Sequence, residues 1–194
     1  AVYRPIQFNK VKEKRYAKVI ENLKDIRAAE MAHREVTGTF QGDFDKLVQF
    51  LDTAEFAITQ RRDTTVLDEE YKKAYGVDQY IEKVIIDTLS FASVADSLFK
   101  GDRERYRNMI NIPIKGVDDK IELRAGTVQK GSSRIPVFEA RVAKSVVLQD
   151  QDRELVLQQN EVQSVDDVNG RYISVGSMEE VNTSGNWPQV YGDQ

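Results

Sequence analysis

The chain has 194 residues, a formal net charge of −4 and a sequence pI near 5.2, which argues against a dedicated nucleic-acid-binding domain because such domains are usually basic. Hydrophobic residues make up 40% and charged residues 31%, a globular composition rather than a disordered one. Cysteine is absent and His33 is the single histidine, which excludes thiolate nucleophiles, disulfides and multi-histidine metal sites. We expect one soluble domain over residues 1–194 with no cofactor.

Charge is distributed unevenly along this chain. Residues 1–36 carry nine basic and five acidic side chains, a net charge of +4, whereas residues 149–194 carry nine acidic and two basic ones, a net charge of −7. Such asymmetry can mark a surface for a partner or for anionic lipid, although a solvated face is the commoner explanation.

Residues 9–53 are predicted to be helical. A first helix over residues 9–36 has one apolar stripe at helical spacing, and Gly38 follows as a stop signal. Glu30 and Arg34 have the spacing of a favourable i,i+4 ion pair on this helix. A second helix is expected after Asp43 as N-cap. The apolar residues of the two helices are Tyr16, Val19, Ile20, Leu23 and Ile26, then Phe44, Leu47, Val48 and Leu51.

Residues 54–181 are predicted to be mostly β-structure with short helices. Strands are expected over residues 54–61 and 80–91, where β-branched and aromatic side chains are frequent, with one or two helical turns at 94–100. The clearest β signal is a hairpin of residues 120–129 and 134–144 around Gly131, in which Pro136 favours an edge position. A short helix is expected over 150–161, and residues 182–194 read as a tail.

The order of these elements predicts an α+β fold. Neither the long helix nor the hairpin can hide its apolar face alone, and helices followed by strands favour layering. We therefore expect the first helix to lie across an antiparallel sheet that contains the hairpin around Gly131, a pilin-like arrangement.

Three patterns suggest catalytic or ligand sites. Residues 126–133 have the glycine spacing of a phosphate-binding loop, but Ser132 stands where the motif needs lysine, so a hairpin turn is the better interpretation. Asp150, Asp152 and Glu154 alternate like the start of a calcium loop without its essential glycine, which leaves them as weak metal candidates. A serine-type triad would have to use His33, whose place beside the apolar stripe is typical of a structural histidine.

The tail contains the single tryptophan. Trp187 and Tyr191 lie in a turn-like segment with no periodic apolar face, so we expect them to anchor the tail on the sheet or the first helix. If they were exposed, they would be the best partner-binding candidates, because tryptophan and tyrosine dominate interface hot spots.

Part of the chain resembles the first part of a pilin or pseudopilin. In those proteins a long helix leads through a glycine–aromatic turn to a short helix and an antiparallel sheet. The segments that carry this resemblance are Ile26–His33, Thr37–Phe40 and Phe44–Leu47. The whole chain resembles an uncharacterised family of single-pass envelope proteins of Gram-negative bacteria. This second resemblance rests on Tyr3–Phe8, Ile58–Asp63, Ile86–Leu89, Pro136–Arg141 and Val175–Thr183. It implies a hydrophobic anchor ahead of Tyr3 and provides no catalytic residues.

The leading functional hypothesis is a non-catalytic interaction or structural domain of a membrane-anchored envelope protein. It would be held at the inner membrane through an anchor ahead of Ala1, face the periplasm and bind protein partners rather than nucleic acid. The basic stretch from Lys10 to Lys18 would instead favour the cytoplasmic side. The alternatives are a carboxylate-based hydrolase acting on envelope glycans and a subunit of a pilus or pseudopilus-type secretion assembly.

Overall fold

A computed structural model describes residues 2–194, and its longest element is helix α1, Tyr3–Thr37. The helix begins six residues before the predicted start because Pro5 lies in the first turn, where proline costs no intrahelical hydrogen bond. It ends as predicted at Gly38, whose backbone has φ 87° and whose N–H donates to the Arg34 carbonyl at 2.8 Å.

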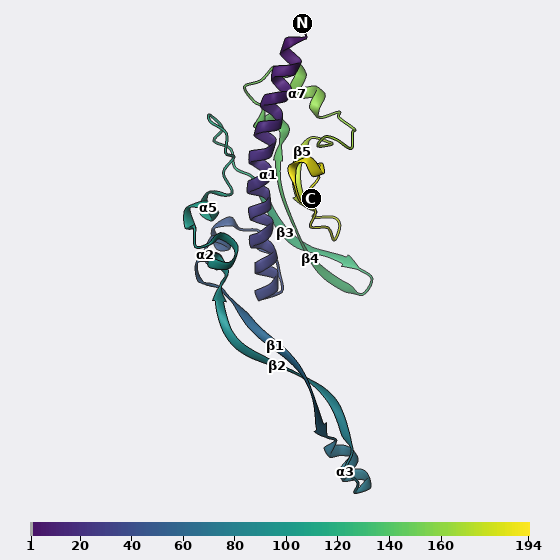
Figure 1. Cartoon of the computed structure of the whole chain (residues 1–194). Coiled ribbons are helices and arrows are strands. Elements are labelled where there is room, and N and C mark those ends of the chain that lie inside the picture. The colour runs from purple at the N-terminus through teal and green to yellow at the C-terminus, as the bar shows by residue number, and fades with distance from the viewer. Residues whose placement is uncertain (1) are drawn as a thin grey trace.

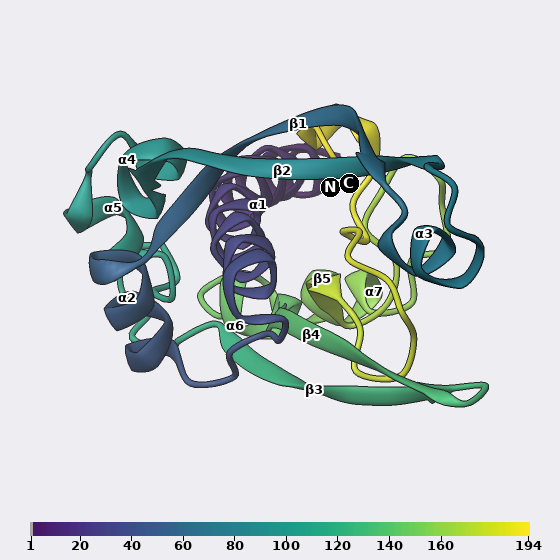
Figure 2. The same cartoon turned by 90° about the horizontal axis from the view of Figure 1, so that it is seen from below.

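The predicted apolar stripe of α1 is the centre of the core. Its five members are fully buried: Tyr16, Val19, Ile20, Leu23 and Ile26. One side of α1 packs against a sheet formed by β3, Glu122–Lys130, β4, Ser133–Ala143, and β5, Tyr172–Gly176. Another side meets helices α2, Phe44–Thr53, and α4, Val94–Phe99 (Figure 2). The expected α+β layering of a long helix on an antiparallel sheet is thus confirmed.

The three-stranded sheet contains the predicted hairpin. Its order is β3-β4-β5, all antiparallel, and Gly131 turns between β3 and β4 with φ 62°. Pro136 lies in the central strand β4, yet β5 pairs only with residues 139–143 of it. Pro136 therefore lies in a stretch of β4 that pairs with β3 alone. Its missing N–H costs no hydrogen bond to β5, because β5 does not reach this stretch.

Short helices complete the body. Asp43 caps α2 as predicted, accepting from the Lys46 N–H at 3.1 Å. The helix expected over 150–161 is the shorter α7, Arg153–Gln159. Three further elements were not predicted: α5, Arg103–Asn108; α6, Lys144–Val147; and the 3-10 turn η1, Gln189–Tyr191. Strand β5 was also not predicted.

A long two-stranded ribbon projects from this body. Strands β1, Glu55–Leu67, and β2, Tyr80–Ser93, pair along their whole length, and α3, Glu69–Tyr75, closes the far end (Figure 1). The sequence predicted both strands, but it ended the first six residues and the second two residues too early, and it did not predict α3. They form a sheet of their own rather than joining β3–β5. We call residues 55–93 the arm.

Shortening a side chain in the stripe tests the core. Leu23 is completely buried, so Leu23→Ala should lower the free energy of unfolding by about 2–5 kcal/mol through lost burial and a cavity. Urea unfolding followed by circular dichroism measures the change. Leu157→Ala is the control, because Leu157 is 53% exposed and should cost well under 1 kcal/mol. Similar losses in the two variants would contradict the placement of α1.

Candidate functional site

The charge asymmetry of the sequence is largely neutralised inside the molecule. Arg15 of α1 binds both oxygens of Asp150, at 2.7 and 2.9 Å, and the buried Lys12 lies 3.0 Å from Asp167. Further along the same helix, Lys24 donates to the Tyr191 carbonyl at 2.6 Å. The basic face of α1 therefore binds the acidic C-terminal segment, and this part of it is occupied by the chain itself.

The three weak metal candidates have separate structural contacts. Asp150 is held by Arg15, whose hydrogen bonds keep the pKa of that carboxyl well below its usual range. Asp152 caps α7 and accepts from the N–H groups of Glu154 and Leu155 at 3.0 and 3.2 Å. Glu154 is exposed in the first turn of α7. Within residues 2–194, no group of three potential ligands is positioned to hold a metal ion.

Trp187 anchors the tail, as predicted. The ring is fully buried, its indole N–H donates to the Asp193 carbonyl at 2.8 Å, and the Arg27 guanidinium of α1 lies 5.7 Å from the ring centroid. Gly185 leaves room for it, since a Cβ there would lie 2.3 Å from the ring. Tyr191 is half-buried, and this burial, with Asp167 and Glu13 nearby, raises the pKa of its hydroxyl to about 12. A partner could reach Trp187 only by displacing the tail.

A buried polar cluster lies where α1 meets the C-terminal segment. The Lys144 ammonium has no exposure and donates to the carbonyls of Gln159, at 2.7 Å, and Val168. Burial lowers its pKa to about 8, with Asp167 acting in the opposite direction. The Tyr16 hydroxyl is buried nearby without a hydrogen-bond partner, and its burial raises its pKa. The Lys144 ammonium ties the end of α7 to the segment around Val168, and the periodicity of the sequence contained no signal for this lysine.

His33 and the glycine pair have structural positions too. The His33 Nδ1 lies 2.5 Å from the Thr39 carbonyl, and the ring packs at 4.7 Å from that of Phe50. The Thr37 hydroxyl also lies 3.0 Å from the His33 Nδ1 and donates to the His33 carbonyl at 2.8 Å, so these contacts close the C-terminal end of α1. Residues 126–133 form strand, turn and strand, as the missing lysine predicted.

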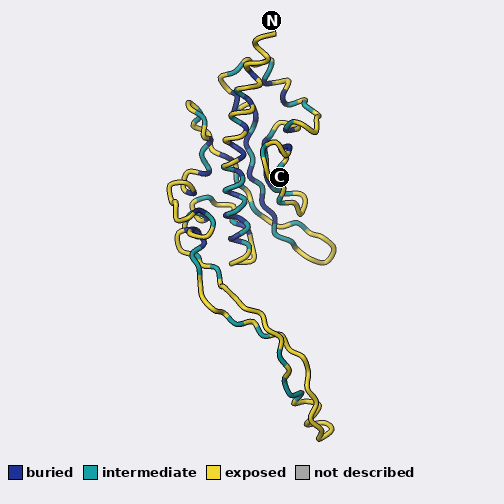
Figure 3. The backbone as a smooth tube through the Cα atoms, in the orientation of Figure 1, coloured by how far each residue is buried: buried dark blue, intermediate teal, exposed yellow. Residues whose placement is uncertain are grey.

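The arm is the part of the molecule that the body does not cover. None of residues 55–93 is buried (Figure 3). Ten of the eighteen large hydrophobic side chains exposed on the described chain belong to it: Ile58, Tyr71, Tyr75, Val77, Tyr80, Ile81, Val84, Ile86, Leu89 and Phe91. Soluble monomers usually expose such side chains singly, so their concentration in one projecting segment distinguishes the arm from the body.

The arm has its own internal contacts. Its register pairs Leu67 with Tyr80 at the far end and Glu55 with Ser93 at the base, with one irregularity beside Ile58. Arg62 binds Asp87 across the strands at 2.7 Å. At the far end, Asp68 caps α3 by accepting from the Tyr71 N–H at 3.0 Å. The arm is therefore an ordered ribbon and not an irregular loop.

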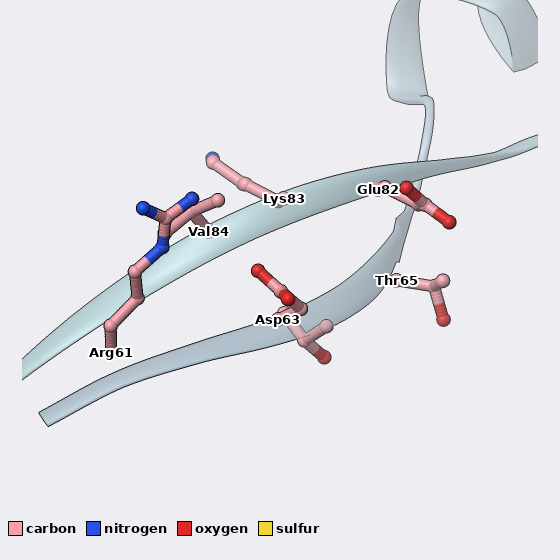
Figure 4. Close-up of a pocket in the computed structure, with 7 residues that line it drawn as sticks. Arg61, Asp63, Thr65, Glu82, Lys83 and Val84 are labelled. Carbon is pink, nitrogen blue, oxygen red and sulfur yellow. The ribbon is translucent and has the colours of Figure 1, made fainter.

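A hollow of about 740 Å³ lies along this ribbon (Figure 4). Every residue that lines it comes from β1 or β2, including Arg61, Asp63, Glu82 and Val84. Because no other element faces these side chains, the hollow is the concave side of a twisted ribbon rather than an enclosed pocket. Its lining is charged and polar, with Val84 as the single large apolar side chain.

No protein-family model, curated protein or solved structure matches this chain. Among residues 2–194, no helix is both long and apolar enough to cross a membrane.

Proposed function

We propose that this chain is the non-catalytic interaction domain of a membrane-anchored protein of the cell envelope, and that the arm is its interaction surface. One observation carries the proposal: residues 55–93 form an ordered ribbon with ten exposed large hydrophobic side chains and no buried residue.

The energetics of a free ribbon support this proposal. A two-stranded hairpin is at best marginally stable in water, because its apolar side chains gain little from burial. Here the two strands are 13 and 14 residues long, and the ribbon meets the body at its base, where Phe56 packs against the core. A partner laid along the arm would remove this surface from water and satisfy the open backbone groups of its edges.

The opposite end of the molecule suits an attachment to a membrane. The first turn of α1 is exposed, with Val2 at 75%, Tyr3 at 70% and Ile6 at 49%. This turn and the tip of the arm lie at opposite ends of the molecule (Figure 1). An anchor ahead of α1 would therefore direct the arm away from the membrane, into the periplasm.

The filament-subunit alternative is favoured by one feature, the long first helix lying on an antiparallel sheet. The segment encoded ahead of Ala1 distinguishes the two: a prepilin-type cleavage site would favour the filament subunit, and a plain hydrophobic anchor would favour the tethered domain. For the hydrolase alternative, the hollow of the arm has Asp63 and Glu82 on one open ribbon, without a facing wall to enclose a glycan.

The proposal predicts where the full-length protein touches its partner. A photo-crosslinking amino acid at Ile86 or Phe91, which are 67% and 64% exposed, should form a discrete adduct in the native host. The matched control is Val165, 90% exposed on the body, where we expect no adduct. Adducts from Val165 but none from the two arm positions would overturn the proposal.

A further inference from the structure

We propose that the partner of the arm is a second copy of this chain, joined by antiparallel pairing of the two β2 strands about a two-fold axis at Ile85. This inference rests on the proposed role of the arm and identifies its partner.

The β2 strand has one open edge. It pairs with β1 alone from Tyr80 to Ser93, and the sheet has no third strand. Every second residue of such a strand therefore directs its N–H and C=O away from the sheet, where another strand can bind them. Two copies can meet through this edge in antiparallel fashion when the same residue of each lies on the axis.

Centring the pair on Ile85 makes β2 complementary to itself. Lys83 of each copy then lies opposite Asp87 of the other, which gives two ion pairs related by symmetry. On the other face, Val84 lies opposite Ile86, and both are exposed in the single chain, at 46% and 67%. Opposite charges and apolar pairs facing one another directly are the contacts that stabilise antiparallel strands.

Neighbouring registers lose this match. Centring on Val84 places Ile81 opposite Asp87, and centring on Ile86 places Ile85 opposite Asp87. Both put an apolar side chain against a carboxylate, because moving the axis by one residue changes the partner of each residue by two positions.

The β1 edge is a poor alternative. Its central residues are Arg61, Arg62 and Asp63, so a two-fold axis at any of these residues places two like charges directly opposite. The self-complementary edge is thus β2.

The charges at the proposed interface are accessible in the single chain. Asp87 keeps 42% of its side-chain surface exposed although it binds Arg62, and Lys83 is exposed. A carboxylate has room for both cations, since its two oxygens offer about four acceptor positions. In the dimer, Asp87 would lie between Arg62 of its own chain and Lys83 of the second copy.

The absence of cysteine permits a direct geometric test. In the Ile85→Cys variant, the two new cysteines face each other across the axis. Their Cα atoms would be about 4.5–5.5 Å apart, a separation that a disulfide can span. Mild oxidation of the full-length protein should give a covalent dimer. Ile81→Cys is the matched control: its two copies would lie about 27 Å apart, so it should stay uncrosslinked. Equal crosslinking at both positions, or none at Ile85→Cys, would overturn the register.

Charge exchange provides the second test. In Lys83→Glu the new carboxylate faces Asp87 of the second copy, and in Asp87→Lys the new ammonium faces Lys83, so each variant alone should dimerise about tenfold more weakly than the parent. Mixing the two variants restores both opposite-charge pairs, and native mass spectrometry should show a one-to-one heterodimer. This recovery also demonstrates that both variants are folded.

The outcomes separate this inference from the proposed function. A parent protein that stays monomeric, or a mixture that associates no better than its components, would refute pairing through β2. If photo-crosslinking at Ile86 then captured a different protein, the arm would remain an interaction surface with another partner. If the arm positions formed no adduct at all, both proposals would be wrong.

Discussion

Replacing Trp187 by alanine should lower the free energy of unfolding by about 3–5 kcal/mol, the range measured for deleting buried aromatic side chains. The ring is fully buried between the tail and α1, and its N–H bonds the Asp193 carbonyl. The substitution would leave a cavity and would also release the 3-10 turn that follows it. Urea unfolding followed by circular dichroism measures the loss.

Val190 provides the control for Trp187, because it lies in the same tail but is 82% exposed. Val190→Ala should change the stability by less than about 0.5 kcal/mol. In the unsubstituted protein, the fluorescence of Trp187, the single tryptophan, should be blue-shifted and resistant to iodide. A freely quenched, red-shifted emission would show instead that the tail is detached.

The elements that the sequence predicted well are those whose signal is local. The α1 stripe repeats with the helical period, so Leu23 and its neighbours mark the buried face directly. The β3–β4 hairpin is specified by alternation around Gly131, where a positive φ favours glycine. Each of these features is contained within some thirty residues or fewer.

The contacts between α1 and the C-terminal segment could not be predicted in this way. Lys12 and Asp167 are 155 residues apart, and only the folded chain brings them together. The opposite net charges of the two segments were visible in the sequence. That complementarity was the one signal that the two segments bind each other. Lys144 gave none, because nothing in the sequence distinguishes a lysine whose ammonium binds two distant backbone carbonyls from any other lysine.

The arm shows a different limit. Its strands were recognised, but the position of the ribbon was not, since apolar residues occur on both faces of β2. Ile85 and Ile86 are neighbours and so point to opposite faces. That pattern ordinarily indicates a strand covered on both sides within a domain. Here it belongs to a strand that no part of the described chain covers.

Glu30 was assigned to an exposed ion pair with Arg34, and the structure corrects this assignment. The Glu30 carboxyl is fully buried and accepts from the Gln41 N–H at 3.1 and 3.3 Å, while Arg34 lies over the Phe40 ring at 5.3 Å. The i,i+4 spacing permits contact between the two side chains. The turn at Gly38, however, folds residues 39–41 back onto the inner face of α1, and this segment buries the Glu30 carboxyl.

This burial makes stability depend on pH. Desolvation raises the pKa of Glu30 from its ordinary 4.5 to about 8, although the Gln41 hydrogen bond acts to lower it. Between these two values the folded chain binds a proton that the unfolded chain has released. The contribution of Glu30 is therefore fully present below about pH 4.5 and is lost as the pH rises through 8, by roughly 4 kcal/mol at pH 8.

Glu30→Gln should remove this dependence. The amide keeps an oxygen to accept from the Gln41 N–H and carries no charge at any pH. The variant should therefore gain stability over the parent by roughly 4 kcal/mol at pH 8 and by less than about 1 kcal/mol at pH 5. Urea unfolding at pH 5, 6, 7 and 8 measures the difference between the two profiles. Glu35→Gln, at an exposed glutamate of the same helix, should follow the parent throughout. Parallel profiles for Glu30→Gln and the parent would mean that the buried carboxyl is ionised across this range, stabilised by the Gln41 hydrogen bond against the cost of burial.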